Sequence, residues 1–252
     1  MRALVTNDDG IDSAGLRALA RVATEAGLEV VVAAPDTEYS GSSASLTALE
    51  EDGKLLMHEK SLPGLDGVRA FGVEATPGFI AFAAAYGAFG PVPDLVLSGV
   101  NHGPNTGHAV LHSGTVGAAL TARTHGTSAL AMSCVSPDPV HWESAAEMAS
   151  RVLGWLVDNA GGDPLTLSVN VPDRPLADVR GLRTARLASF GAVQADVGET
   201  GEGYVTMTFH EVDEDLEPGT DAALLADGWA TVTSLAAPCE ADGVDLSALT
   251  DT

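Results

Sequence analysis

Apolar and polar positions near the start of the chain predict two strands joined by a helix. Residues 2–6 (RALVT) form a short, mainly apolar run, and residues 28–34 form a second one. Between them, apolar residues recur at the spacing of one helix face: Leu16, Leu19, Ala20 and Ala23. Asp12 or Ser13 is available as the N-terminal cap of this helix. A strand, a helix and a strand in this order form a βαβ unit, which has a right-handed crossover and a parallel sheet.

Predicted strands and helices continue to alternate through the middle of the chain. Residues 94–98, 129–134 and 165–169 are short apolar runs typical of buried strands, and residues 116–123 have a helical pattern. A longer helix is predicted from an apolar face that consists of Trp142, Ala145, Ala146, Ala149, Val152, Leu153 and Leu156. This alternation predicts an α/β fold with a mostly parallel sheet.

The pattern changes toward the end of the chain. Residues 204–209 alternate like a half-exposed strand, an acidic segment follows at 211–217, and a short helix precedes a strand at 229–235. We interpret residues 1–252 as one domain, in which residues from about 180 to 252 are an elaboration rather than a separate folding unit. We expect this elaboration to form an arm that packs on a partner chain.

Length and composition favour a soluble protein with one core. The chain has 252 residues, 45% of them hydrophobic, but no apolar run approaches the roughly 18 residues of a membrane span. The opening residues MRALVTNDDG lack the pattern of a signal peptide. We therefore expect a cytoplasmic protein without a membrane partner.

Cys134 and Cys239 lie far apart, which argues against a disulfide framework and against a thiolate metal site.

The charge of the chain restricts its partners. Its 12 basic and 35 acidic residues give a formal net charge of −23. Such a field repels nucleic-acid polymers, so we expect none as a partner. It also repels small phosphorylated substrates, unless a bound cation or exposed backbone N–H groups supply local positive charge.

Polar residues gather where the predicted strands end. Residues 7–10 (NDDG) follow the first strand, residues 35–41 follow the second, and the glycine-rich residues 99–107 follow the third. Residues 113–115 (SGT) then precede a predicted helix. Open parallel sheets place their sites beyond the carboxyl ends of the strands, so we expect these segments to converge on one crevice.

The side chains in this crevice suit a hard cation and a phosphate group. The carboxylates of Asp8 and Asp9 are typical ligands of Mg²⁺, Mn²⁺ or Ca²⁺, although Asp-Asp-Gly is also common turn chemistry. Ser40 and Asn101 add neutral oxygen donors and leave coordination positions open. The hydroxyls and free N–H groups of residues 113–115 could hold phosphate, and simple helix capping is the alternative.

Four blocks of sequence together resemble one known family. They are residues 4–15 (LVTNDDGIDSAG), residues 34–36 with Ser40 and Gly41, residues 98–105 (SGVNHGPN) and residues 113–116 (SGTV). Their order and spacing look like those of the SurE family of survival-protein nucleotidases. Weaker similarities at residues 170–173 and 228–233 extend the resemblance to almost the whole chain.

The resemblance implies a Rossmann-like α/β fold with helices on both faces of the sheet, plus a C-terminal hairpin and arm exchanged between subunits. A homodimer or a dimer of dimers is expected on this basis. The family hydrolyses nucleoside 5′- and 3′-monophosphates with a divalent cation. One cation per subunit is therefore expected here, Mg²⁺ or Mn²⁺, with Ca²⁺ as a substitute in crystals.

The resemblance also assigns roles to residues of this chain. The family's metal ligands correspond to Asp8, Asp9, Ser40 and Asn101, of which the two aspartates are also the catalytic residues. The family's phosphate contacts correspond to Asn7, Ser113, Gly114 and Thr115, and Asn105 is expected beside them.

The departures from the family pattern concern the surroundings of the metal residues. Residues 36–39 (DTEY) replace a segment that is usually basic, and residues 75–79 (ATPGF) only partly match the family's G-T-P-[TAG]-D-C block. His108-Ala109 replaces an acidic pair, and His112 replaces a tyrosine. We consider His108 and His112 candidate general acids, ahead of His102, against the alternative that each is a solvated loop residue. These changes leave the identity of the leaving group open.

Together the residues favour a phosphate monoesterase in which the cation orients or acidifies a water that attacks phosphorus in line. Direct attack by Asp8 is less favoured, because the Asp-x-Asp spacing of the haloacid-dehalogenase phosphatases is missing. Two other functions remain open: a phosphatase specialised for one phosphorylated biosynthetic intermediate, and a nucleotide sensor without turnover.

Overall fold

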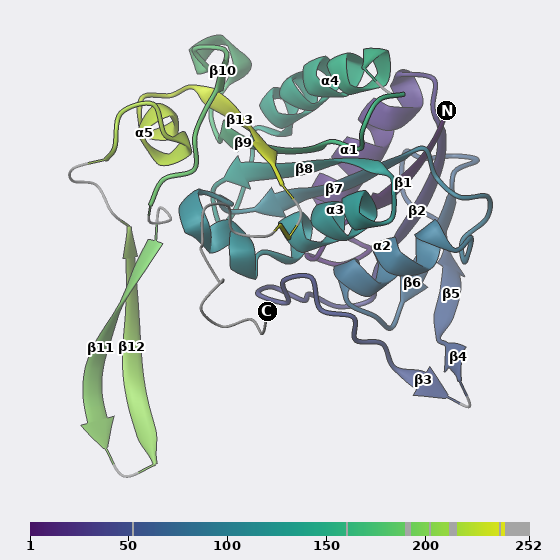
Figure 1. Ribbon diagram of the computed structural model, residues 1–252, viewed down its shortest axis with the longest axis horizontal. Helices are drawn as coiled ribbons and strands as arrows, with labels where there is room; N and C mark the ends of the chain where they lie inside the picture. Colours follow the sequence, from purple (N-terminus) through teal and green to yellow (C-terminus); the bar gives the residue numbers. More distant parts are fainter. Residues whose placement is uncertain are drawn as a thin grey trace, which may run out of the picture.

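One large sheet runs through the centre of the molecule in the computed structural model (Figure 1). The structure describes residues 1–51, 53–159, 161–189, 193–201, 203–211, 216–236 and 238–239. The nine strands of the sheet are β1 (Arg2–Thr6), β2 (Glu29–Pro35), β5 (Met57–Lys60), β6 (Arg69–Val73), β7 (Leu95–His102), β8 (Ser128–Val135), β9 (Thr166–Pro172), β10 (Leu182–Thr184) and β13 (Ala230–Leu235). They lie in the order β10-β13-β9-β8-β7-β1-β2-β6-β5.

The pairing of the strands is mostly parallel, as predicted. The two antiparallel pairs of this sheet are β13 with β9 and β5 with β6. From β1 the chain moves outward through β2 to β6, and it then returns to the other side of β1 to form β7 and β8. The direction of winding therefore reverses between β1 and β7, which is the position where open α/β sheets form a ligand crevice.

Helices cover both faces of this sheet. Helices α1 (Ala14–Glu25) and α4 (Trp142–Asp158) pack side by side on one face, and α2 (Pro77–Ala85) and α3 (Gly114–Thr124) pack on the other (Figure 1). The fold is therefore Rossmann-like, as predicted. No helix in the described ranges is long and apolar enough to cross a membrane.

Two apolar cores explain why the central strands have apolar residues on both faces. In β1, Ala3 and Val5 face the core under α1 and α4, whereas Leu4 faces the core under α2 and α3. In β7, Leu97 and Val96 divide between the two cores in the same way. Side chains alternate along a strand, so a strand buried on both faces needs apolar residues at every position.

Most predicted elements are present, but β7 is longer than predicted. The sequence pattern placed a strand at 94–98 and a loop from Gly99, whereas β7 continues to His102. The register between β7 and β8 shifts between Ser98 and Asn101, after which Asn101 pairs with Ser133. The polar residues that suggested a loop are thus part of a strand end that faces the crevice.

The later part of the chain contains a long hairpin that leaves the body of the molecule (Figure 1). Its strands β11 (Val193–Gly201) and β12 (Tyr204–Glu211) pair only with each other among the described strands. The short helix and final strand predicted after it are α5 (Asp221–Ala226) and β13. Much of the acidic segment at 211–217 lies outside the described residues, and the exchange of this part between subunits stays a prediction.

Other elements lie where the sequence pattern had assigned none. They are the short pair β3 (Glu50–Glu51) and β4 (Lys54–Leu55), the strands β5, β6, β10 and β11, helix α2, and two 3₁₀ helices at Gly107–His112 and Leu176–Asp178. Helix α2 begins with Pro77 in its first turn, a position that proline favours because the missing N–H has no helical partner there.

Candidate functional site at the strand switch point

Asp8 and Asp9 lie directly beyond the end of β1, at the point where the winding reverses. The turn that holds them is fastened to the end of β2 and the segment after it: the N–H of Ile11 donates to Pro35 O over 2.8 Å, and the N–H of Tyr39 donates to Asp8 O over 2.7 Å. Gly10 has a φ of 93°, which a residue with a side chain adopts only with strain. The structure thus brings the first two predicted loops together.

The carboxylate of Asp8 is held by the first turn of α3. The hydroxyl of Thr115 donates to Asp8 Oδ1, and the backbone N–H of Thr115 bonds to the same carboxylate. A Cβ on Gly114 would lie only 2.8 Å from Asp8 Oδ2, so glycine is needed for this approach. Burial nevertheless raises the pKa of Asp8, because these hydrogen bonds only partly replace the lost water.

Asp9 is less buried than Asp8 and contacts the end of β7. The backbone N–H of His102 bonds to its carboxylate, while Asp9 Oδ2 is buried without a hydrogen-bond partner among the described residues. Burial, followed by the negative charge of Asp8, raises the pKa of Asp9 to about 6, and His102 opposes this rise. A carboxylate in this state gains stability from a cation.

Ser40 and Glu38 lie on the segment that follows β2. The hydroxyl of Ser40 donates to Glu38 Oε1 over 2.6 Å, and both residues are exposed. Ser40 is one residue from Tyr39, whose N–H bonds to the backbone of Asp8. The segment therefore runs along the exposed side of the aspartate pair.

Two asparagines use their side-chain nitrogens in hydrogen bonds within the protein, which leaves their side-chain oxygens to bind a ligand. The amide nitrogen of Asn101 donates to Gly103 O over 2.9 Å and to His102 O over 3.2 Å. The amide nitrogen of Asn7 donates to Gly10 O and to the Ser13 hydroxyl, each over 3.0 Å. The oxygen of Asn7 is buried without a hydrogen-bond partner in the described part of the chain. Asn7 was predicted to contact phosphate, but its donors are already used within the turn.

The predicted phosphate cradle at Ser113, Gly114 and Thr115 is mostly occupied by groups of the protein. Ser113 caps α3, because its hydroxyl accepts from Val116 N over 3.1 Å. Both donors of Thr115 go to Asp8. In the first turn, the N–H of Gly114 has no acceptor among the described residues, so it is the donor that remains for phosphate.

Asn105 holds the loop after β7 against the end of β9. Its backbone N–H donates to Asn170 Oδ1 over 2.8 Å, and the amide of Asn170 returns a bond to Asn105 O over 2.9 Å. Its amide nitrogen donates to the Ser133 hydroxyl over 2.7 Å. Asn105 therefore shapes the crevice wall, and a contact with phosphate stays a prediction.

The three histidines near the crevice are exposed. His102 packs its ring against Trp142 with centroids 5.4 Å apart, and its proximity lowers the pKa of Asp9. His112 accepts a backbone bond at its carbonyl from Ser43, which joins the 3₁₀ helix Gly107–His112 to the segment after Ser40. His108 lies on the same short helix. A general acid at His108 or His112 stays a prediction.

The predicted ligand residues have the chemistry of a site for a hard cation. The described residues contain no cluster of three or more His, Cys, Asp or Glu side chains that could hold a metal ion. The predicted set instead combines two carboxylates with neutral hydroxyl and amide oxygens. Buried oxygens of Asn7 and Asp9 without partners are costly unless a positive group is close. This favours a cation beside the aspartates.

Two residues with a part in this region were missed by the sequence pattern. Glu38 accepts from Ser40, and the buried Asp221 of α5 accepts from the N–H of Gly107 over 2.8 Å and from that of Ala188 over 3.0 Å. Asp221 thereby ties the end of the chain to the loop after β7. In the sequence, Asp221 is recognisable only as an aspartate that follows the helix cap Thr220. Aspartates are common at this position, so the sequence does not identify its role.

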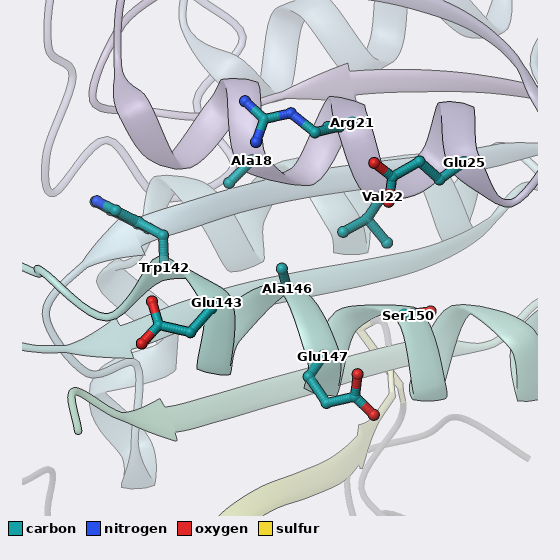
Figure 2. A pocket seen from close by; sticks show the side chains of 9 residues that line it. All are labelled: Ala18, Arg21, Val22, Glu25, Trp142, Glu143, Ala146, Glu147 and Ser150. Atoms are coloured by element: carbon teal, nitrogen blue, oxygen red, sulfur yellow. The ribbon is translucent and has the colours of Figure 1, made fainter. Parts of the chain in front are cut away.

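A groove of about 410 Å³ elsewhere in the molecule contains none of the predicted site residues. It lies between α1 and α4, and Figure 2 shows the side chains that line it: Ala18, Arg21, Val22, Glu25, Trp142, Glu143, Ala146, Glu147 and Ser150. Arg21 is its single basic group, against Glu25, Glu143 and Glu147. Because these groups line the outer surface of two helices, the groove is not part of the crevice at the strand ends.

The fold and the site define a Rossmann-like α/β protein with a carboxylate pair at the switch point of its sheet. The sequence model of the family described as "Survival protein SurE" matches residues 3–192. The chain belongs to the SurE family.

Relatives along the whole chain support this assignment. The chain is 35% identical over 239 residues to "5'-nucleotidase SurE" of Aeromonas hydrophila, a match that covers 93% of this chain and 92% of the relative. It is 37% identical over 242 residues to "5'-nucleotidase SurE 1" of Burkholderia lata and 36% identical over 245 residues to "5'-nucleotidase SurE" of Archaeoglobus fulgidus. These matches cover 93% of this chain and 90% and 91% of those relatives.

A solved structure has the same fold. The crystal structure of the SurE protein from Aquifex aeolicus superimposes with a TM-score of 0.79 at 27% sequence identity, and the match covers 95% of each chain.

Proposed function

We propose that this protein is a phosphomonoesterase that uses one divalent cation to hydrolyse nucleoside 5′-monophosphates, and nucleoside 3′-monophosphates as well. The observation that carries the proposal is the carboxylate pair Asp8–Asp9 at the switch point, with unpaired oxygens beside it and the first turn of α3 next to it. The names of the relatives, which are 5′-nucleotidases, support the substrate class.

The residues divide into cation ligands and phosphate contacts. Asp8, Asp9, Ser40 and Asn101 would hold Mg²⁺ or Mn²⁺, which suit this set of oxygen donors. The bound cation would polarise the phosphoryl group and lower the pKa of the attacking water. The N–H of Gly114 would bind a phosphoryl oxygen at the N-terminus of α3, where the helix dipole also favours negative charge.

Water is a better nucleophile here than Asp8. Asp8 is only 3% exposed, and one of its oxygens is held by Thr115. The other oxygen lies against Gly114. An attack on phosphorus would require this carboxylate to leave its hydrogen bonds, so we propose that Asp8 stays in place and that water attacks.

A phosphate-release assay tests the proposal. We expect release from p-nitrophenyl phosphate and from at least one nucleoside monophosphate with Mg²⁺ or Mn²⁺, and none with excess EDTA. Asp9→Asn should lower the rate by at least about 100-fold, which corresponds to roughly 3 kcal/mol. The control Asp12→Asn changes an exposed aspartate close in sequence and should keep the rate.

The same assay separates the alternatives. Nucleotide binding without any release of phosphate would indicate a sensor. Hydrolysis of one phosphate monoester far above all nucleotides would indicate a specialised phosphatase, which the altered segments 36–39 and 75–79 make a serious alternative. No release with Mg²⁺, Mn²⁺ or Ca²⁺ would refute the proposed activity.

A further inference from the structure

Glu38 places a third negative charge at the exposed side of the aspartate pair. Its carboxylate accepts a 2.6 Å hydrogen bond from Ser40, which fixes the side chain on the segment next to Asp8. The charge of Glu38 acts on both Asp8 and Asp9. Glu38 itself is exposed, so its charge faces solvent beside the aspartate pair.

No lysine or arginine offsets these three carboxylates among the described residues. The ion pairs of that part of the chain involve Asp94, Asp36, Asp12, Glu59 and Glu143 as the acidic partners. Two nearby basic residues are occupied elsewhere, since Lys60 pairs with Asp12 over 2.5 Å and Arg17 donates to Asp12 O. Within the described ranges, Asp8, Asp9 and Glu38 therefore form no ion pair with a lysine or arginine.

Glu38 is better placed to act on the substrate than on the cation. The described part of the chain contains no group of three or more His, Cys, Asp or Glu side chains that could hold a metal ion, so Glu38 does not complete one with Asp8 and Asp9. One of its oxygens accepts from the Ser40 hydroxyl, so Glu38 would act on the cation only through that residue. Its charge therefore lies on the solvent side of the aspartate pair, where it can act on the part of a substrate beyond the phosphate.

We propose that Glu38 makes this site select phosphate monoesters whose alcohol is neutral or positively charged, and disfavour those with a second anionic group. The inference rests on the proposed function, because it concerns the leaving group of the same site. Charges of one sign at the entrance of a cleft raise the local concentration of substrates of opposite charge and weaken the binding of substrates of like charge.

Three sugar phosphates provide a matched series for the test. All three carry the same phosphate group. Glucosamine 6-phosphate has an ammonium in addition, glucose 6-phosphate has no further charge, and 6-phosphogluconate has a carboxylate. We expect kcat/KM to fall in that order, by about two- to fivefold per step, as is typical of exposed charge pairs. The steps should shrink as NaCl is raised, because salt screens exposed charges.

Glu38→Gln isolates the charge, because glutamine keeps an acceptor for Ser40. We expect this variant to bring the three kcat/KM values within about twofold of one another, and Glu38→Lys to reverse their order. The control Glu25→Gln removes the same charge from the end of α1, which is exposed and lies away from the crevice, and should keep the wild-type order.

Binding measurements keep this inference separate from the proposed activity. Calorimetry with Ca²⁺ and each ester should give dissociation constants in the same order for the wild type and nearly equal ones for Glu38→Gln. If no ester is hydrolysed but this order holds, the activity fails and the role of Glu38 stands. Equal affinities in the wild type, an unchanged order in Glu38→Gln, or loss of Mn²⁺ binding in that variant would each overturn the inference.

Discussion

The hydroxyl of Thr115 donates a hydrogen bond of 2.5 Å to Asp8 Oδ1, across 107 positions of sequence. Thr115 is the second residue of α3, and Asp8 follows β1, so the bond joins a helix N-terminus to the carboxyl end of the central strand. Both side chains are buried. The orientation of the first aspartate is therefore set by the protein itself.

Loss of this bond should weaken the cation site. In Thr115→Val the buried carboxylate loses a donor, which costs about 1.5–3 kcal/mol for a charged group. We expect Mn²⁺ to bind about tenfold or more weakly, and kcat to fall more than KM rises, because Asp8 acts on the cation and not on substrate directly. Titration calorimetry and steady-state kinetics measure the two effects.

Two further variants test whether Thr115 acts through Asp8. Thr115→Ser keeps the hydroxyl and should restore most of the Mn²⁺ affinity. Thr121→Val removes another buried threonine hydroxyl of α3, one that donates to Gly117 O, and should leave Mn²⁺ binding unchanged. A Thr115→Val protein that binds Mn²⁺ normally but loses affinity for phosphate would instead support the phosphate contact predicted from sequence.

Asp9→Asn should separate the stability of the protein from its cation binding. Two carboxylates close together without a cation repel each other. In EDTA, the melting temperature of Asp9→Asn should therefore be no lower than that of the wild type. A cation that binds the native state at a hundred times its Kd adds about 2.7 kcal/mol, and this stabilisation should be lost in the variant. A clear rise in Tm with Mn²⁺ in Asp9→Asn would remove Asp9 from the ligand set.

The fold could be predicted from sequence because burial on both faces leaves a simple pattern. The inner residues of strands such as β1 and β8 are mostly apolar on both faces, and α1 has a clear apolar face with Ser13 as its cap. Local patterning and capping agree with the final structure in these segments. The end of β7 was misassigned because its polar residues serve the crevice, and polarity alone does not distinguish a loop from a functional strand end.

The site could be predicted in outline but not in its hydrogen bonds. The blocks around Asp8 and Ser113 give the residue types and their order along the chain. The sequence blocks do not show that Thr115 bonds to Asp8 or that Ser40 bonds to Glu38. These pairings depend on how α3 and the segment after β2 pack against the turn that holds Asp8 and Asp9. The partner of a polar side chain is a tertiary property, and it needs the structure.

The hairpin of β11 and β12 should support the predicted dimer. Large apolar side chains are exposed on it, at Val197, Tyr204, Val205 and Met207. Exposed apolar side chains on a projecting ribbon are typical of association surfaces. We expect light scattering to give about twice the chain mass of 25.6 kDa, and to give the monomer mass when Val197, Val205 and Met207 are replaced by serine.

Val92→Ser is the matched control, since Val92 is 46% exposed but lies outside the hairpin. It should leave the mass unchanged. A wild type that stays monomeric at all concentrations would refute the dimer, and a dimer that survives the triple substitution would place the interface elsewhere.

The raised pKa values of the aspartates should make the cation-free protein less stable as pH rises from about 4 to 6. In the unfolded chain Asp9 loses its proton near its ordinary value of 3.8, whereas in the folded protein burial and Asp8 raise its pKa to about 6. Between these values the folded state binds more protons, so the free energy of unfolding falls as pH increases, by up to about 3 kcal/mol. Asp8 contributes in the same direction, because burial also raises its pKa.

Urea unfolding in EDTA at several pH values between 4 and 7 measures this loss. Other carboxylates also titrate in this range, so the comparison that matters is the wild type against Asp9→Asn. The variant cannot ionise at position 9, and its stability should therefore fall less steeply with pH. Saturating Mn²⁺ should also flatten the wild-type curve, because the cation takes the place of the proton between the two carboxylates. Parallel curves for the two proteins in EDTA would show that the proton affinity of Asp9 is the same in the folded and the unfolded chain.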